Sequence, residues 1–170
     1  MIHLSNGRGQ LGRELQKFPL EQYTEEVYIY HTWNVEDKSE LIQVKEYEKF
    51  QEFVDKHTDK KIIFTSTYSI KENWYNQYKQ LAEAYLLINC DNGIVIRLPT
   101  LIGKGILQEF KNKNTKAYGE MNLISVHDAA IKILEKVKYN GLVKSFRVKG
   151  EIVQAKTIKD VIRTYCKTNE

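Results

Sequence analysis

A tyrosine and a lysine lie four residues apart in the middle of this chain, shortly after a row of three hydroxyl side chains. Tyr75 and Lys79 would share one face of a helix, because residues four apart lie one above the other. The hydroxyls of Thr65, Ser66 and Thr67 end an apolar run that is typical of a buried strand. A phenol, an ammonium group and a hydroxyl that face one crevice can transfer a proton to or from a bound oxygen. Ser66, Thr67, Tyr75 and Lys79 are therefore the candidate catalytic residues.

The elements around these residues predict a strand–helix–strand unit. The sequence predicts a strand over residues 62–67, an amphipathic helix over 74–88, and a second buried strand at 94–96 that is closed by Pro99. A unit of this length joins two parallel strands, whose carboxyl ends meet at the same edge of the sheet. Open α/β sheets bind their ligands at that edge. We expect the hydroxyls to lie there.

A glycine-rich turn near the amino terminus is the candidate phosphate-binding loop. It lies between a short strand predicted at residues 1–5 and a helix predicted at 10–17. The pattern G-x-G-x-x-G in this context is typical of dinucleotide binding, since the glycines allow a tight turn and a close backbone approach to a pyrophosphate. The alternative is a turn that only packs the helix against the strand. The candidate cofactor-binding residues of the loop are Asn6, Gly7, Arg8, Gly9, Gln10, Leu11 and Gly12.

The order of these motifs resembles the extended branch of the short-chain dehydrogenase/reductase superfamily, which includes nucleotide-sugar epimerases, dehydratases and 4-keto reductases. Residues 75–83, YNQYKQLAE, are similar to its YxxxK…E signature, and the preceding FTST is similar to its strand that ends in a catalytic Ser or Thr. Residues 97–103, RLPTLIG, resemble its Arg-Leu-Pro-Asn-x-x-Gly segment, and GQLGREL resembles the start of the dTDP-4-dehydrorhamnose reductases.

The resemblance implies an NAD(P)-dependent oxidoreductase or epimerase that acts on a nucleotide-linked sugar, in surface-polysaccharide synthesis. It implies that Tyr75 is the acid/base, that Lys79 lowers the pKa of the phenol and binds the nicotinamide ribose, and that Thr67 or Ser66 binds the same substrate oxygen. Thr65 and Pro99 would contact the cofactor. The alternative is a catalytically silent Rossmann-like module that binds a nucleotide or a protein partner without turnover.

The nucleotide preference follows from the end of the second predicted strand, residues 26–31. A dinucleotide-binding fold places an acid roughly 20 residues past the glycines to bind the adenosine ribose. Tyr30, His31, Thr32 and Trp33 occupy that region instead. Arg8 lies where NADP-preferring relatives often keep a cation, so the sequence favours NADP over NAD. The missing acid equally fits a loss of cofactor binding.

The chain is shorter than the superfamily pattern. Between the second strand and residue 62 it predicts only a short strand at 41–44 and a helix from about 46 to 57, so we expect one or two βα units to be missing there. The loop at 68–74 is also short, and about 70 residues follow Pro99. These segments predict helices at 105–112, at 129–137 with Asp128 as N-cap, and at 157–165, with a strand at 145–148.

The expected fold is α/β: one domain over residues 1–170, built on a small Rossmann-like doubly wound parallel sheet with helices on both faces. Residues from about 105 to 170 would stand in for a much reduced C-terminal substrate lobe. A second copy of the chain or a partner subunit could complete the substrate site.

Composition narrows the class of protein further. Apolar residues make up 42% and charged residues 28%, as in ordinary globular proteins. The net charge of +4 comes from scattered lysines, which does not indicate nucleic-acid binding. The two cysteines fit neither a disulfide framework nor a metal site. The sequence shows no signal peptide or membrane-spanning run, so we expect a cytoplasmic protein without a membrane partner.

Overall fold

The computed structural model describes residues 1–67, 69, 71–103 and 119–155. Its main sheet is parallel throughout, with the strand order β1-β2-β3-β4-β7. The expectation of a Rossmann-like parallel sheet is confirmed. The strands are β1 Ile2–Leu4, β2 Val27–Tyr30, β3 Lys61–Thr67, β4 Gly93–Leu98 and β7 Ser145–Arg147.

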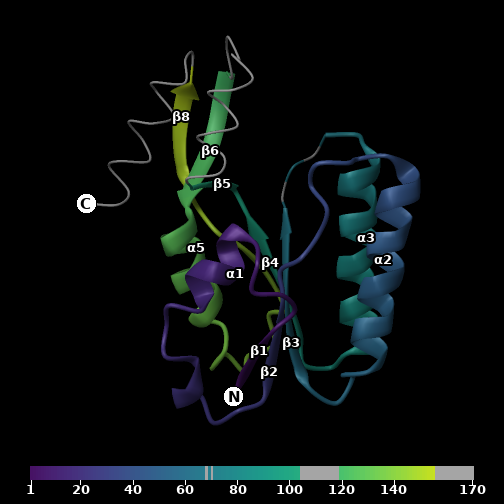
Figure 1. The fold of residues 1–170 in the computed structure, drawn as a ribbon, viewed down its shortest axis with the longest axis vertical. Coiled ribbons are helices and arrows are strands. Elements are labelled where there is room, and N and C mark those ends of the chain that lie inside the picture. The colour runs from purple at the N-terminus through teal and green to yellow at the C-terminus, as the bar shows by residue number, and fades with distance from the viewer. Residues whose placement is uncertain (68, 70, 104–118, 156–170) are drawn as a thin grey trace.

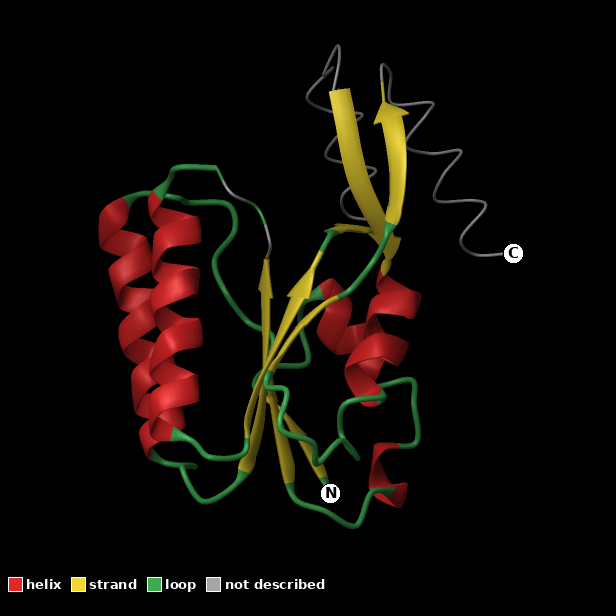
Figure 2. Ribbon diagram, turned by 180° about the vertical axis from the view of Figure 1, so that it is seen from behind, coloured by secondary structure: helices red, strands yellow, loops and turns green. Residues whose placement is uncertain are grey.

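Helices cover both faces of this sheet, as the sequence predicted (Figures 1 and 2). On one face, α1 and α5 pack over a core that includes Ile63 of β3. On the other face, α2 and α3 pack over a core that includes Ile62 and Phe64 of the same strand. Alternate residues of β3 therefore face opposite helix layers. The helices are α1 Gln10–Leu15, α2 Glu40–Asp55, α3 Trp74–Asn89 and α5 Val126–Leu134, with a 3₁₀ turn, η1, at Leu20–Gln22.

A second, smaller sheet contains β5 Thr100–Ile102, β6 Gly119–Ser125 and β8 Glu151–Ala155. Strand β6 is parallel to β5 and antiparallel to β8. This sheet extends beyond the carboxyl ends of the main strands (Figure 2). It lies where the sequence predicted a reduced C-terminal lobe. The helices expected at 105–112 and 157–165 fall outside the described residues.

The strand order corrects the expected position of the missing units. In the classical doubly wound sheet the order is 3-2-1-4-5-6, so the strand that follows the first helix lies on the opposite side of β1 from the fourth strand. Here β2 pairs with both β1 and β3. The linear order matches the segment 1-4-5-6 of the classical sheet, which gives β2 the place of the fourth strand. The missing units therefore lie between α1 and β2, and not between β2 and β3.

The path of the chain supports this assignment. Strands β1, β2 and β3 advance in one direction across the sheet, yet α1 and α2 lie on opposite faces. The two connections must therefore have opposite hands, although about 98% of parallel crossovers are right-handed. In the classical fold, the second and third strands come between the first helix and the fourth strand along the chain. If these two strands are removed, α1 connects directly to the fourth strand, and the first two connections have opposite hands.

Two local expectations are wrong. Residues 41–44 do not form a strand but belong to α2, because they continue its helical packing and Gln43 is buried. Asp128 is not the N-cap of α5. Ser125 takes that position and its hydroxyl accepts a hydrogen bond from the Asp128 backbone, while Asp128 lies in the first turn.

Candidate functional site

An open hollow of about 460 Å³ lies at the carboxyl ends of β1 and β2. The helices that follow these two strands leave toward opposite faces of the sheet, which opens a crevice between them, the usual binding position of an open α/β fold. Of the predicted cofactor-binding loop, Asn6 and Gly9 line this hollow. The full lining is Asn6, Gly9, Tyr30, His31, Thr32, Trp33, Glu46 and Lys49.

The glycines of the loop serve two different purposes. A Cβ on Gly12 would lie 2.6 Å from the Asn6 carbonyl oxygen and 2.7 Å from Cε1 of His31, so this glycine is needed to pack α1 against the end of β2. A Cβ on Gly9 would meet no atom within 4 Å, which leaves open space beside the backbone for a ligand. Gly12 fits the packing interpretation and Gly9 fits the binding one.

The remaining loop residues differ in their exposure. Arg8 is exposed and does not line the hollow, while its backbone NH donates to the Asn6 side chain at 2.9 Å. Leu11 is buried in the core. Gly7 and Gln10 also lie outside the lining.

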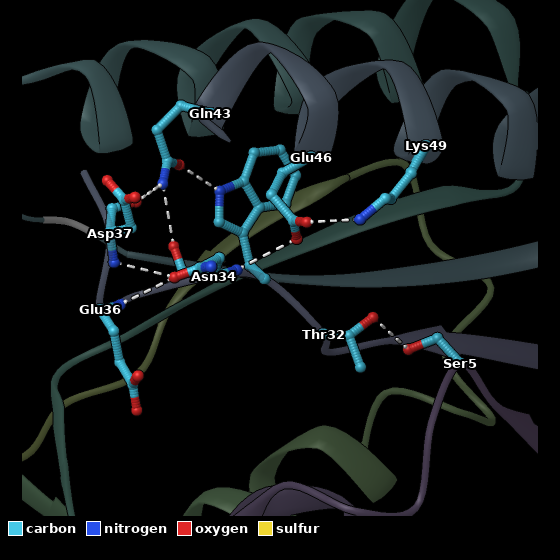
Figure 3. Close-up of polar contacts among 9 residues, drawn as sticks. Ser5, Thr32, Asn34, Glu36, Asp37, Gln43, Glu46 and Lys49 are labelled. Atoms are coloured by element: carbon cyan, nitrogen blue, oxygen red, sulfur yellow. Dashed lines mark hydrogen bonds and ion pairs between the residues drawn. The ribbon is translucent and has the colours of Figure 1, made fainter. Parts of the chain in front are cut away.

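His31 lines the hollow with a largely buried ring. Its Nε2 atom is buried and has no hydrogen-bond partner, and burial lowers the pKa of the ring below its ordinary value. The backbone NH of His31 donates to the Ser5 hydroxyl at 3.2 Å, and that hydroxyl also lies 3.1 Å from the Thr32 hydroxyl (Figure 3). The ring therefore lies at the wall of the hollow, and its Nε2 atom is closed off from solvent next to the Asn6 backbone.

A hydrogen-bond network fixes Trp33 at the wall of the hollow. The indole Nε1 donates to Oε1 of the buried Gln43 at 2.7 Å. The Gln43 amide donates in turn to the carbonyl oxygens of Asn34 and Asp37, at 3.0 and 2.6 Å. Every polar atom of this side chain is therefore used to hold the segment after β2.

The same segment receives a carboxylate from α2. Glu46 accepts hydrogen bonds from the Asn34 backbone at 3.1 Å and from Lys49 at 2.9 Å, and both side chains reach the hollow. The sequence showed no acid at the end of the second strand, yet the structure supplies one from the neighbouring helix. The sequence predicted a helix that starts at about residue 46, and so it left Gln43 and the first turn of α2 outside the helix.

Lys79 is buried between aromatic rings. Its Nζ atom donates to the Thr65 carbonyl at 2.7 Å and lies 4.7 Å from the ring centroid of Trp33 and 4.5 Å from that of Phe64. Burial lowers the pKa of this amine from 10.5 to about 7, against the opposing effect of Glu83. Lys79 is therefore partly neutral near physiological pH, which is unusual for a lysine.

Tyr75 lies beside Lys79 but is not activated by it. The Lys79 Nζ atom lies 6.0 Å from the centroid of the Tyr75 ring. Burial raises the pKa of the phenol to about 12, the opposite of the lowering expected from a neighbouring ammonium group. Loss of water disfavours the charged form of the phenol, and the lowering expected from Lys79 together with a bound nicotinamide cation stays a prediction.

The candidate hydroxyls of β3 divide between the two faces of the sheet. Ser66 lies on the same face as Phe64 and Lys79, because side chains alternate along a strand, and its hydroxyl is buried without a partner. The Thr67 hydroxyl accepts a hydrogen bond from the Ser69 backbone at 3.1 Å. Ser66 is therefore better placed than Thr67 to act with the Tyr75–Lys79 pair.

The hollow and the Tyr75–Lys79 pair meet at Trp33. None of Tyr75, Lys79, Ser66 and Thr67 lines the hollow, and neither do Thr65 and Pro99. Trp33 lines it and also contacts Lys79. The structure thus places Tyr75 and Lys79 behind one wall of the hollow, with Ser66 on the same face of the sheet and Thr67 on the other face. Asn6 and Gly9 of the glycine loop form another wall.

An ion pair fixes α3 relative to β4. Arg97 donates from Nε to both carboxylate oxygens of Glu83, at 3.1 and 3.0 Å. The Glu83 side chain is only 6% exposed, and that of Arg97 is 31% exposed. These two residues belong to the two motifs that carry the sequence resemblance, and the structure pairs them.

Comparison with known proteins gives the fold. No protein-family model and no curated protein matches the chain. Among solved structures, a dTDP-4-dehydrorhamnose reductase from Clostridium acetobutylicum superposes with a TM-score of 0.74 at 16% identity, over 99% of this chain and 80% of that one. The chain has the fold of the extended short-chain dehydrogenases/reductases.

Two further structures of this fold show the range of similar proteins. A UDP-N-acetylglucosamine 4-epimerase from Bacillus cereus has a TM-score of 0.71 at 12% identity, over 96% of this chain and 78% of that one. The Bordetella bronchiseptica enzyme WbmG in complex with NAD and UDP has a TM-score of 0.69 at 12% identity, over 99% and 78%. The short-chain dehydrogenase/reductase fold is present here in a shortened form.

The structure suggests neither a metal site nor a membrane span. Among the residues described, no group of three or more His, Cys, Asp or Glu side chains is arranged to hold a metal ion. None of the described helices has the length and apolar character needed to cross a bilayer.

Proposed function

We propose that this chain is an NAD(P)-dependent oxidoreductase or epimerase that acts on a nucleotide-linked sugar, in surface-polysaccharide synthesis. One observation carries the proposal: in a short-chain dehydrogenase/reductase fold, Tyr75 and Lys79 lie side by side on α3, and Lys79 donates to the Thr65 carbonyl at the carboxyl end of β3, next to a hollow at the glycine loop. The similar structures include a reductase, an epimerase and a complex with NAD and UDP.

The residues of the hollow fit the nicotinamide and phosphate part of such a cofactor. The open space beside Gly9 allows a phosphate to approach the backbone. Asn6 and Thr32 add polar groups to the same wall. When bound, the cofactor supplies or accepts the hydride.

The protein's own residues handle the proton. Tyr75 exchanges a proton with a hydroxyl or ketone of the sugar, and Ser66 donates a hydrogen bond to the same oxygen. With a pKa near 7, Lys79 can hold or release a proton at neutral pH beside Tyr75. The expected completion of the substrate site by a second copy of the chain or by a partner subunit is part of this proposal, and size-exclusion chromatography with light scattering tests the second-copy form of it.

Replacement of Tyr75 by Phe tests this assignment. Tyr75→Phe removes only the phenolic oxygen, so we expect turnover of a nucleotide-linked keto sugar to fall by at least about 100-fold, the usual contribution of a general acid/base. Cofactor affinity should stay within about twofold. Turnover is followed by nicotinamide absorbance over a panel of such sugars. Tyr78→Phe, one residue before Lys79 on α3, is the matched control and should retain activity. Unchanged turnover in Tyr75→Phe would remove Tyr75 from the mechanism.

A second candidate function is a silent nucleotide-binding module, and one observation favours it. The Trp33 ring lies between the hollow and Lys79, and Gln43 holds it there. In that case a nicotinamide nucleotide would bind, but no keto sugar would be turned over by the unmodified chain. A titration with NADH and NADPH, together with the same substrate panel, separates the two candidates.

A further inference from the structure

The chain between α1 and β2 is too short to hold an adenosine site. Residues 16–26 are all described, and they contain only the 3₁₀ turn η1. In the classical fold, two mononucleotide-binding halves flank the crevice, and one half is built from the two strands beyond β1. Within the described residues, no strand pairs with that side of β1. One of the two halves is therefore missing.

We propose that the crevice binds the nicotinamide mononucleotide half of the cofactor alone and gains nothing from the adenosine half. This inference rests on the function proposed above, because it names the part of the cofactor that the same hollow recognises. The expected ligand is reduced or oxidised nicotinamide mononucleotide, either free or as part of NAD(H) or NADP(H).

The residues that remain suit one nucleotide. The volume of about 460 Å³ falls within the range of small-molecule pockets, roughly 300–1,000 Å³. Trp33 presents an aromatic ring against which a nicotinamide can stack, and Glu46 offers carboxylate oxygens to ribose hydroxyls. The phosphate fits the open space beside Gly9, and Lys49 places a cation at the rim of the hollow to attract that phosphate.

The same topology explains the missing ribose acid. The acid of the classical fold lies at the end of the second strand, beside the adenosine ribose. Strand β2 takes the place of the fourth strand here, so residues 30–33 face the other half of the crevice. The 2′-phosphate that distinguishes NADP from NAD belongs to the adenosine ribose, which has no site. Arg8 therefore has no 2′-phosphate to bind, and NADH and NADPH should bind with the same affinity.

Fluorescence titration of a Trp74→Phe variant tests the inference. The chain has two tryptophans, so this variant leaves Trp33, in the wall of the hollow, as the only indole. The variant is titrated separately with reduced nicotinamide mononucleotide, NADH and NADPH, and the quenching of Trp33 is followed. We expect the three dissociation constants to agree within about threefold, and AMP not to displace any of them.

A Gly9→Val variant locates the binding. A Cβ at Gly9 meets no protein atom within 4 Å, so the fold should be unaffected while the open space is filled. We expect all three ligands to bind at least tenfold more weakly and by the same factor. Equal binding to Gly9→Val would place the site elsewhere and overturn the inference.

The outcomes separate this inference from the proposed function. If NADH or NADPH binds more than tenfold tighter than the mononucleotide, or if the two differ by more than tenfold, an adenosine site exists and the inference alone is overturned. If none of the three binds to a protein shown to be folded by circular dichroism, the oxidoreductase function fails, and this inference fails with it.

Discussion

Trp33 is the residue on which the chemistry of the site depends. Its ring lines the hollow, contacts the amine of Lys79 and is held by the buried Gln43. By keeping water from Lys79, the ring contributes to the lowered pKa of that amine. The environment of Lys79 therefore includes a residue that follows β2, more than 40 positions earlier in the chain.

Removal of this ring should raise the pKa of Lys79. In Trp33→Ala, water reaches the amine, and its pKa should rise from about 7 toward the ordinary 10.5. The measurement is an NMR pH titration of the side-chain signals of protein grown with ¹³C-labelled lysine, with Lys79 assigned by its loss in Lys79→Met. Trp74→Ala is the matched control, because Trp74 is exposed and has no contact with Lys79 in the structure. A pKa that stays near 7 in Trp33→Ala would show that Phe64 and the strand alone exclude the water.

For single residues, spacing in the sequence identified Tyr75, Lys79 and Ser66 as candidates, but it did not predict the pKa values of Tyr75 and Lys79. A four-residue spacing places two side chains on one helix face, and it says nothing about how much water reaches them. The pKa of Tyr75 was therefore expected to fall, whereas burial raises it. Glu46 and Gln43 were missed because they act on the segment after β2 through tertiary contacts, which no local pattern contains.

Among the elements, α3 and its two flanking strands follow the sequence closely. Apolar runs with a period of two or of 3.6 residues are strong local signals, and they predicted β3, α3 and β4 to within a few residues. The first turns of α2 were missed because a run of apolar, partly β-branched residues at 41–44 also suits a strand. Only the packing of Gln43 against the segment after β2 settles that ambiguity.

The attachment of α3 to β4 gives a prediction at this scale. Arg97→Met leaves the nearly buried carboxylate of Glu83 without its partner, and unpaired buried charges are costly. Because the Arg97 side chain is partly exposed, we expect the free energy of unfolding to fall by about 3 kcal/mol, the lower end for such changes. Urea denaturation measures it.

A second substitution makes that result specific to the ion pair. Glu83→Gln in the Arg97→Met background removes the unpaired charge and should recover part of the loss. Arg13→Met, on the exposed surface of α1, is the matched control and should change stability by less than about 0.5 kcal/mol. A loss of stability in Arg97→Met no larger than that of the control would show that Glu83 does not depend on Arg97.

For the whole molecule, the fold class could be predicted from the sequence but the strand order could not. Successive βα units look alike in sequence, so a shortened chain does not reveal which units are missing. The order is decided by the pairing of β2 with both β1 and β3, between residues more than 20 positions apart. That pairing shows that the missing strands belong to the adenosine side of the crevice. Strand β2 is therefore not the strand at whose end the ribose acid is expected, which explains why no acid follows it.

The buried Lys79 should also make the stability of the whole protein depend on pH. In the unfolded chain its pKa is the ordinary 10.5, and in the folded protein it is about 7. Below pH 7 the amine is protonated in both states, and the folded state bears the full cost of a desolvated charge. Between the two pKa values the unfolded state binds the extra proton, so the free energy of unfolding rises with pH, by at most about 1.4 kcal/mol per pH unit.

Comparison with Lys79→Met isolates this effect. Other groups titrate as well: burial raises the pKa of Tyr75 to about 12, which lowers stability only above pH 10, and such contributions cancel in the difference between the two proteins. Urea denaturation at several values between pH 7 and 9 should show the unmodified chain gaining stability relative to Lys79→Met as pH rises. Lys45→Met, at an exposed position of α2, should keep the profile of the unmodified chain. Parallel profiles for the unmodified chain and Lys79→Met would mean that water reaches this amine in the folded protein, and Trp33 would then not close the hollow from the Tyr75–Lys79 pair.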